Sequence, residues 1–109
     1  MEIPKLAIEK ERENLYYVYL FYVEDNWWAF GYSAYYLSIM YPVLETDNEI
    51  CLLDEVNMPC VHVPDNFLAS LSDIYNTLAS DNYIRVEAPP TAYCYRKDYD
   101  EWCMSLTVN

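Results

Sequence analysis

Residues 22–34, which read Tyr-Val-Glu-Asp-Asn-Trp-Trp-Ala-Phe-Gly-Tyr-Ser-Ala, decide how this chain folds. They join an aromatic, strand-like run to a run with helical spacing, and they contain Gly31, the only glycine among 109 residues. Because residues 24–26 have turn chemistry, we expect a β-hairpin whose return strand covers residues 27–32. The two tryptophans of this return strand therefore lie directly before the point where the chain changes from strand to helix.

The segments on either side of this stretch have clear patterns of their own. Residues 15–23 are rich in β-branched and aromatic residues and predict a strand. Neither of its faces is polar, which indicates a central strand covered on both sides. On the other side, Ser33 is a suitable N-cap, and the apolar spacing from Ala34 predicts a helix that Pro42 closes at about Tyr41.

The remaining segments complete an α+β pattern. The expected elements are a short helix over 3–14, a loop over 45–49, strands over 50–53 and 58–63 separated by 54–57, a helix over 65–79, a strand over 83–87, an extended segment over 91–95 and a final helix over 98–106. Asp65 or Asn66 would cap the long helix, and Asn82 would end it in the left-handed conformation. The order predicts a single α+β domain, residues 1–109, with a mixed β-sheet flanked by helices. The pairing of the short strands stays open.

The charge of the chain limits its partners. Eighteen acidic and six basic residues give a net charge of −12, with the acids gathered at 45–55, 65–87 and 98–101. Such a chain has no generally basic face with which to hold a phosphate backbone. The acidic surface, interleaved with tyrosines, either is ordinary solvated surface or imitates a nucleic acid and meets a basic partner.

Cysteine usage and hydropathy indicate a cytoplasmic protein. None of the four cysteines forms a Cys-x-x-Cys pair, the N-terminus lacks the apolar region of a signal peptide, and reduced thiols are expected. The longest apolar run, Leu15–Val23, has nine residues and is too short to span a bilayer.

Cys60 and His62 are the main candidates for chemistry. A metal site would need Cys51, Cys94 or Cys103 in addition, but no spacing matches a zinc module. His62 beside a cysteine nucleophile, or a pair of carboxylates, would suggest catalysis, but no nucleophile elbow or phosphate loop accompanies them. We therefore interpret Cys60 and His62 as packing residues, and we expect neither a metal, a cofactor nor an enzyme.

Two blocks of the chain carry a family pattern. The first is residues 24–34, in which Asp25, Phe30, Gly31 and Ala34 match the pattern Gly-Asp-Phe-Tyr-Glu-x-Phe/Tyr-Gly-x-Asp-Ala. In this block Ser33 replaces an aspartate in the same capping role.

The second block is Met-Pro-Cys-Val-His-Val-Pro at residues 58–64, followed by the expected helix and strand, against the pattern Pro-Met-x-Gly-x-Pro. Over about residues 5–88 the chain thus resembles the N-terminal mismatch-recognition domain of the DNA mismatch repair protein MutS, and residues 89–109 form a C-terminal helical extension.

The resemblance implies a free-standing domain that binds mismatched DNA. In MutS a Phe wedges beside the mispaired base and a Glu hydrogen-bonds it; here Asn26 and Trp28 stand at those positions. Trp27 or Trp28 supplies the wedge if the turn shifts by one residue. A chain with one glycine has no Walker A motif, so the ATPase and clamp of MutS are absent.

The candidate contact site is therefore the hairpin. Asn26, Trp27 and Trp28 would touch the nucleic acid or protein partner, while Phe30 and Gly31 would set the geometry between hairpin and helix. Alternation along the strand would put the two indoles on opposite faces. The only residues that could touch phosphates are Lys5, Lys10, Arg12, Arg85, Arg96 and Lys97. The alternative to DNA is a basic protein partner, and a minor third possibility is self-association through exposed aromatic residues.

Overall fold

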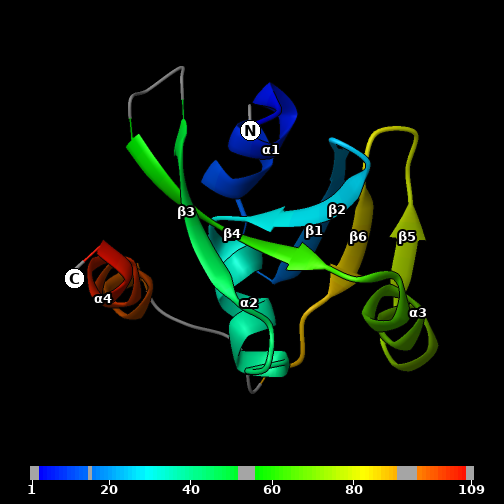
Figure 1. Ribbon diagram of the computed structural model, residues 1–109. Helices are drawn as coiled ribbons and strands as arrows, with labels where there is room; N and C mark the ends of the chain where they lie inside the picture. Colours follow the sequence, from blue (N-terminus) through cyan, green and yellow to red (C-terminus); the bar gives the residue numbers. More distant parts are fainter. Residues whose placement is uncertain (1–2, 15, 52–55, 91–95, 108–109) are drawn as a thin grey trace.

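A six-stranded sheet forms the centre of the molecule, with helices on both faces (Figure 1). The computed structural model describes residues 3–14, 16–51, 56–90 and 96–107, and within them the side chains of 48–51, 56–57, 96–97 and 106–107 are not described. The segment 91–95, expected to be extended, lies outside this range. The elements are α1 (Lys5–Arg12), β1 (Tyr17–Val23), β2 (Asn26–Phe30), α2 (Tyr32–Met40), β3 (Thr46–Cys51), β4 (Val56–Val63), α3 (Asp65–Ile74), β5 (Thr77–Ala79), β6 (Ile84–Glu87) and α4 (Arg96–Thr107).

The combination of helices and a β-sheet confirms the expected α+β class. The expected mixed sheet is wrong, because the sheet is antiparallel throughout. Its order is β3-β4-β2-β1-β6-β5, and each neighbouring pair runs antiparallel. The helical connections do join strands of the same direction, as crossovers normally do. However, β4 lies between β2 and β3, and three strands lie between β4 and β5. The strands joined by a helix are therefore never neighbours.

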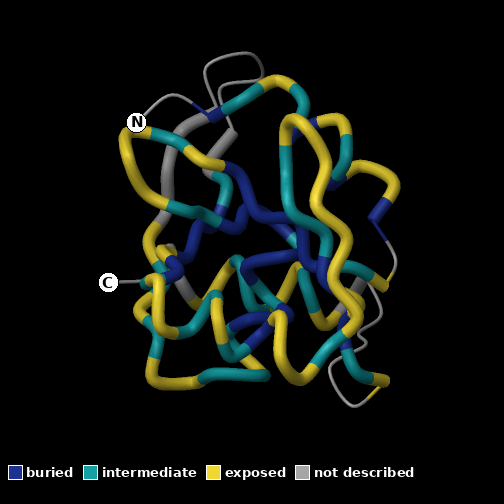
Figure 2. Tube along the Cα trace, turned by 90° about the vertical axis from the view of Figure 1, so that its right-hand side faces the viewer, coloured by how far each residue is buried: buried dark blue, intermediate teal, exposed yellow. Residues whose placement is uncertain are grey.

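The central strand β1 separates two apolar clusters. Val18 and Leu20 point to the face covered by α2 and α3, where they join the larger cluster with Leu37 and Leu71. Tyr19 and Phe21 alternate to the other face, where α1 covers them. The buried segments consequently gather in the middle of the molecule (Figure 2). The expected strand covered on both sides is confirmed over residues 17–23; it begins at Tyr17, and residue 15 lies outside the described range.

The return strand expected over 27–32 ends at Phe30, because α2 begins at Tyr32, and β4 begins at Val56 inside the separating segment expected over 54–57. Two further expected boundaries are wrong, and both concern strands at the edges of the sheet. Residues 45–49 are not a loop, because β3 begins at Thr46 and pairs with β4 from Thr46↔Val61 to Cys51↔Val56. The helix expected over 65–79 ends at Ile74, and β5 follows it. The apolar side chains that extended the helical pattern, Ile74 and Leu78, are exposed rather than buried.

Three expected caps are also wrong. The residue before α3 is Pro64, which makes no side-chain cap hydrogen bond, and Asp65 and Asn66 lie inside the helix. The residue before α2 is Gly31, and Ser33 lies inside the first turn with its side chain directed to other elements. Asn82 does not end a helix; it lies in the turn that joins β5 to β6, where the Ser80 N–H donates to the Tyr83 carbonyl at 2.8 Å. Among the described residues only Glu24 and Asp25 combine a side chain with a positive φ.

The terminal helices agree with their predicted positions. α1 lies within the expected 3–14, and α4 contains the expected 98–106. α4 packs against α2 and β3, and its Tyr99 ring stacks on Tyr32 with the centroids 3.9 Å apart. None of the helices in the described ranges has the length and apolar character needed to cross a membrane.

Candidate functional site

The tip of the first hairpin is a strained two-residue turn. Val23 pairs with Asn26, so Glu24 and Asp25 alone make the loop, with φ values of 51° and 67°. Such a turn follows the twist of the strands but normally carries Asn-Gly, because a positive φ brings Cβ against the backbone. The Asn26 Nδ2 group donates to the Glu24 carbonyl at 3.2 Å and helps to hold the turn. Strain of this kind is often found next to functional surfaces.

The two tryptophans that follow the turn face opposite sides of the sheet, as alternation predicts. Trp27 pairs with Tyr22 and packs on the cluster beneath α2 and α3. Its ring meets the Tyr22 ring edge-on with the centroids 5.2 Å apart, and Tyr22 is 58% exposed. Trp27 is itself half-buried, so it is the less exposed ring of an aromatic pair and does not line a cavity.

Trp28 lies on the face that carries α1 and is also half-buried. It pairs with His62 of β4, and the two rings lie 5.3 Å apart at an angle of 47°. The indole Nε1–H is buried, and no acceptor for it exists among the described residues. Leaving such a donor unpaired costs roughly 1–3 kcal/mol. Trp28 thus has both an aromatic face and an unused hydrogen-bonding group.

A pocket of about 360 Å³ opens beside Trp28, and we call it the Trp28 pocket. Its lining comes from β2, β4, the start of β3 and the segments next to them: Asn26, Trp28, Val43, Leu44, Glu45, Asp47, His62 and Pro64. Two carboxylates, Glu45 and Asp47, line it, and no lysine or arginine does. The pocket therefore combines aromatic rings with negative charge, a combination suited to cations.

Sequence reasoning found only part of this pocket. Asn26 and Trp28 were predicted contact residues, and His62 was singled out for other chemistry. Glu45 and Asp47 were missed as pocket residues, although they belong to the acidic group at 45–55, because the strand that brings them next to β4 was interpreted as a loop. Phe30 and Gly31 are both buried, so their role is to position the hairpin and not to contact a partner.

Gly31 is required where the hairpin meets α2. Its φ of 58° and ψ of −127° are accessible to glycine and strained for other residues. Its N–H donates to the Pro59 carbonyl at 2.9 Å, which ties the hairpin to β4. A Cβ at this position would lie 3.2 Å from Cγ of Glu11, a contact that requires movement.

Glu11 forms a buried network that the sequence did not reveal. Its carboxylate lies at the N-terminus of α2, where Oε1 accepts the Ser33 N–H at 3.0 Å and Oε2 accepts the Ser33 hydroxyl. Asn14 Nδ2 also donates to Oε1, at 3.1 Å, and Ser33 Oγ accepts the Tyr19 N–H at 2.8 Å. Burial raises the pKa of Glu11 to about 7, partly offset by these hydrogen bonds. The network joins α1, β1 and α2 below the hairpin, and its role is structural.

The predicted phosphate contacts do not gather at the hairpin. Lys10 lies over the Tyr83 ring at 5.2 Å and Arg85 over the Tyr17 ring at 4.5 Å. Tyr17 begins β1, whereas the turn follows the end of β1, about 20 Å of strand away.

The other four predicted phosphate contacts lie on the terminal helices. Lys5 and Arg12 are on the exposed side of α1. Arg96 and Lys97 belong to α4, but their side chains are outside the described part of the structure.

The residues considered for metal binding and catalysis are spread out. Cys60 is buried beneath α1 and is not part of a disulfide, and His62 is exposed next to Trp28. Cys103 is a free thiol on α4, while Cys94 lies outside the described residues, as does the side chain of Cys51. Within the described ranges, no three His, Cys, Asp or Glu side chains are grouped closely enough to hold a metal ion.

Comparison with protein-family models, with curated proteins and with solved structures finds no match for this chain. The resemblance to the mismatch-recognition domain of MutS therefore rests on the quoted residues alone.

Proposed function

We propose that this chain is a non-catalytic binding module, and that the Trp28 pocket receives a cationic side chain of a basic protein partner. The observation that carries the proposal is the lining of the pocket, which contains the rings of Trp28 and His62 and the carboxylates of Glu45 and Asp47 but no lysine or arginine. A cation over an indole face gains about 0.5–2 kcal/mol, depending on how far it is desolvated. The two carboxylates add charge attraction at the rim of the same pocket.

The charge of the whole chain supports this choice of partner. With a net charge of −12, the domain attracts basic proteins over long range and raises their rate of encounter. On the other face of the sheet, an exposed Tyr22 packs beside Trp27 and offers a second aromatic surface near the hairpin tip. Aromatic residues of this kind commonly dominate the energy of protein interfaces.

The second hypothesis, binding of mismatched DNA, follows from the resemblance to MutS. It would need an aromatic wedge at Trp27 or Trp28 and lysine or arginine side chains on the flanking phosphates. The acidic lining of the Trp28 pocket opposes a phosphate backbone. The Arg85 side chain lies over Tyr17 at the opposite end of β1, and the Lys10 side chain lies over the rings of Tyr19 and Tyr83. These features favour a basic partner over DNA.

One pair of substitutions separates the two hypotheses by the sign of its effect. We would titrate ¹⁵N-labelled protein with a short peptide of alternating arginine and serine, and follow the indole N–H resonance of Trp28. Combining Glu45→Gln with Asp47→Asn should weaken peptide binding by about tenfold, or about 1.4 kcal/mol. The same change should strengthen binding of any DNA, because it removes repulsion.

The matched control is the pair Asp73→Asn and Asp81→Asn. Both residues are exposed and outside the pocket, and the double variant has the same net charge. It should weaken peptide binding only slightly, through the long-range field. Equal weakening by both double variants would contradict the pocket. Binding of a mismatched duplex in preference to a matched one, tightened by neutralising the pocket, would favour the second hypothesis instead.

A further inference from the structure

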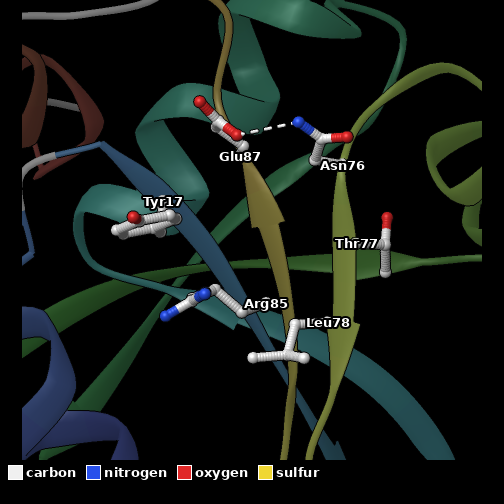
Figure 3. Close-up of a pocket in the computed structure, with 6 residues that line it drawn as sticks. All are labelled: Tyr17, Asn76, Thr77, Leu78, Arg85 and Glu87. Atoms are coloured by element: carbon white, nitrogen blue, oxygen red, sulfur yellow. Dashed lines mark hydrogen bonds between the residues drawn. The ribbon is translucent and has the colours of Figure 1, made fainter.

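A second, smaller pocket lies across β1, β6 and β5, away from the hairpin (Figure 3). Its volume is about 130 Å³, and its lining residues are Tyr17, Asn76, Thr77, Leu78, Arg85 and Glu87. A cavity of about 150 Å³ holds one molecule of benzene. The pocket therefore suits a ligand of about six non-hydrogen atoms.

Arg85 presents an unused guanidinium to this pocket. Its Cζ lies 4.5 Å from the centroid of the Tyr17 ring, and Figure 3 shows the side chain extended alongside that ring. Within the described part of the chain, Arg85 makes no hydrogen bond or ion pair, although the protein carries 18 acidic residues. Stacking holds the planar group in place, so its donors are oriented for a carboxylate.

Glu87 supplies the opposite charge in the same pocket. Its Oε2 accepts a hydrogen bond from Asn76 Nδ2 at 3.1 Å, drawn in Figure 3, which leaves Oε1 available. The backbone of Glu87 is also fixed, because its N–H donates to the Asn76 carbonyl at 2.9 Å.

Arg85 and Glu87 are neighbours on one face but not partners. They stand two residues apart on β6, so their side chains point to the same side with Cα atoms about 7 Å apart. A cation and an anion on one strand face would ordinarily pair with each other. Here each is held by a different neighbour instead, Arg85 by Tyr17 and Glu87 by Asn76.

We propose that this pocket binds a small zwitterion of the size of a free α-amino acid. Its carboxylate would accept hydrogen bonds from Arg85, and its ammonium would donate to Glu87. The aliphatic part would contact the Tyr17 ring and Leu78, which together form the apolar wall. A ligand with a carboxylate alone would meet repulsion from Glu87, and one with an ammonium alone would meet repulsion from Arg85. This inference is independent of the function proposed for the Trp28 pocket.

The test uses L-alanine and two smaller, singly charged probes: acetate, which carries only the carboxylate, and methylammonium, which carries only the ammonium. Each is titrated into the ¹⁵N-labelled chain at constant ionic strength, and the amide resonances of Leu78, Arg85 and Glu87 are followed together with Arg85 Nε–H. L-alanine should bind at least tenfold more tightly than either of the singly charged probes. Equal affinities for L-alanine and acetate, or no saturable shift with L-alanine, would overturn the proposal.

Variants test the two charges separately. Arg85→Gln should abolish binding of L-alanine and acetate alike. Glu87→Gln should weaken L-alanine binding at least tenfold and strengthen acetate binding, a change of opposite sign that a misfolded variant would not produce. The controls Lys5→Gln and Glu9→Gln, both exposed on α1, should leave all three affinities unchanged. L-alanine affinity unchanged in Arg85→Gln would show that the pocket is not the site.

Discussion

The buried carboxylate of Glu11 belongs to the hydrogen-bond network that joins three elements, α1, β1 and α2. A carboxylate at a helix N-terminus usually gains from the exposed N–H groups there. Because the chain buries this one, its pKa rises from 4.5 to about 7, and the folded state binds the proton more tightly than the unfolded state does. The stabilisation from proton binding is complete below about pH 4.5 and is lost as the pH rises through about 7.

The first prediction concerns the pH dependence of stability. Relative to Glu11→Gln, which cannot ionise, the wild type should lose about 3 kcal/mol of unfolding free energy between about pH 4.5 and pH 8. Urea unfolding of both proteins across this range measures the difference, and other titrating groups cancel in it. Parallel stability curves would show that Glu11 has the same affinity for protons in both states.

Glu11 also illustrates what sequence reasoning cannot detect. An acidic residue at position 11 of a charged helix is typical of a solvated face, and its burial follows from Gly31 and Ser33, twenty or more positions away. Gly31 was identified correctly as the position between strand and helix, since a lone glycine there indicates a backbone conformation that other residues rarely adopt.

Among the elements, the strands at the centre of the sheet were predictable and those at its edges were not. β1 and β2 have the aromatic, β-branched composition of covered strands. β3 and β5 are the two edge strands, one reading Thr-Asp-Asn-Glu-Ile-Cys and the other only three exposed residues long. Natural sheets protect their edges with charge and short length, which removes the pattern that identifies a strand.

The same reason explains why half of the Trp28 pocket was missed. Trp28 and Asn26 come from a strand that the sequence reveals, whereas Asp47 comes from the polar edge strand and Glu45 immediately precedes it. A binding site at a sheet edge combines residues from a strand with a clear sequence pattern and residues from an edge strand without one. Only the residues from the aromatic strand were therefore predicted.

The second prediction concerns the hairpin turn. Replacing Glu24 by Asn and Asp25 by Gly should stabilise the protein by about 1 kcal/mol, because these residues adopt a positive φ more readily. Urea unfolding measures the gain. The control pair Glu9→Asn and Asp81→Asn removes the same charges where φ is not positive and should give a smaller change. An equal gain in both pairs would assign the effect to charge instead of backbone strain.

At the scale of the whole molecule, a net charge of −12 on 109 residues produces repulsion that the fold must overcome. The third prediction is that sodium chloride stabilises the domain by screening this repulsion. Raising it from about 10 mM to about 0.5 M shortens the screening length several-fold. The thermal midpoint should then rise by roughly 4–8 °C, corresponding to a gain on the order of 1 kcal/mol.

Salt should at the same time weaken the peptide binding proposed for the Trp28 pocket, since it screens the attraction to the basic peptide as well as the repulsion within the domain. A midpoint that falls or stays constant with sodium chloride would show that the negative charges are already compensated in the folded state.

The place of β1 in the sheet has a consequence for synthesis on the ribosome. The backbone of β1 pairs along one edge with β2, which follows after only two turn residues. Along its other edge β1 pairs with β6, where the partner of Leu20 is Ile84, 64 residues further along the sequence. Until β6 has left the exit tunnel, the emerging hairpin therefore exposes the unpaired backbone edge of a strongly aromatic strand. Chains that stop short of Ile84 should consequently be substrates for chaperones or seeds of aggregation, however well their first half is formed.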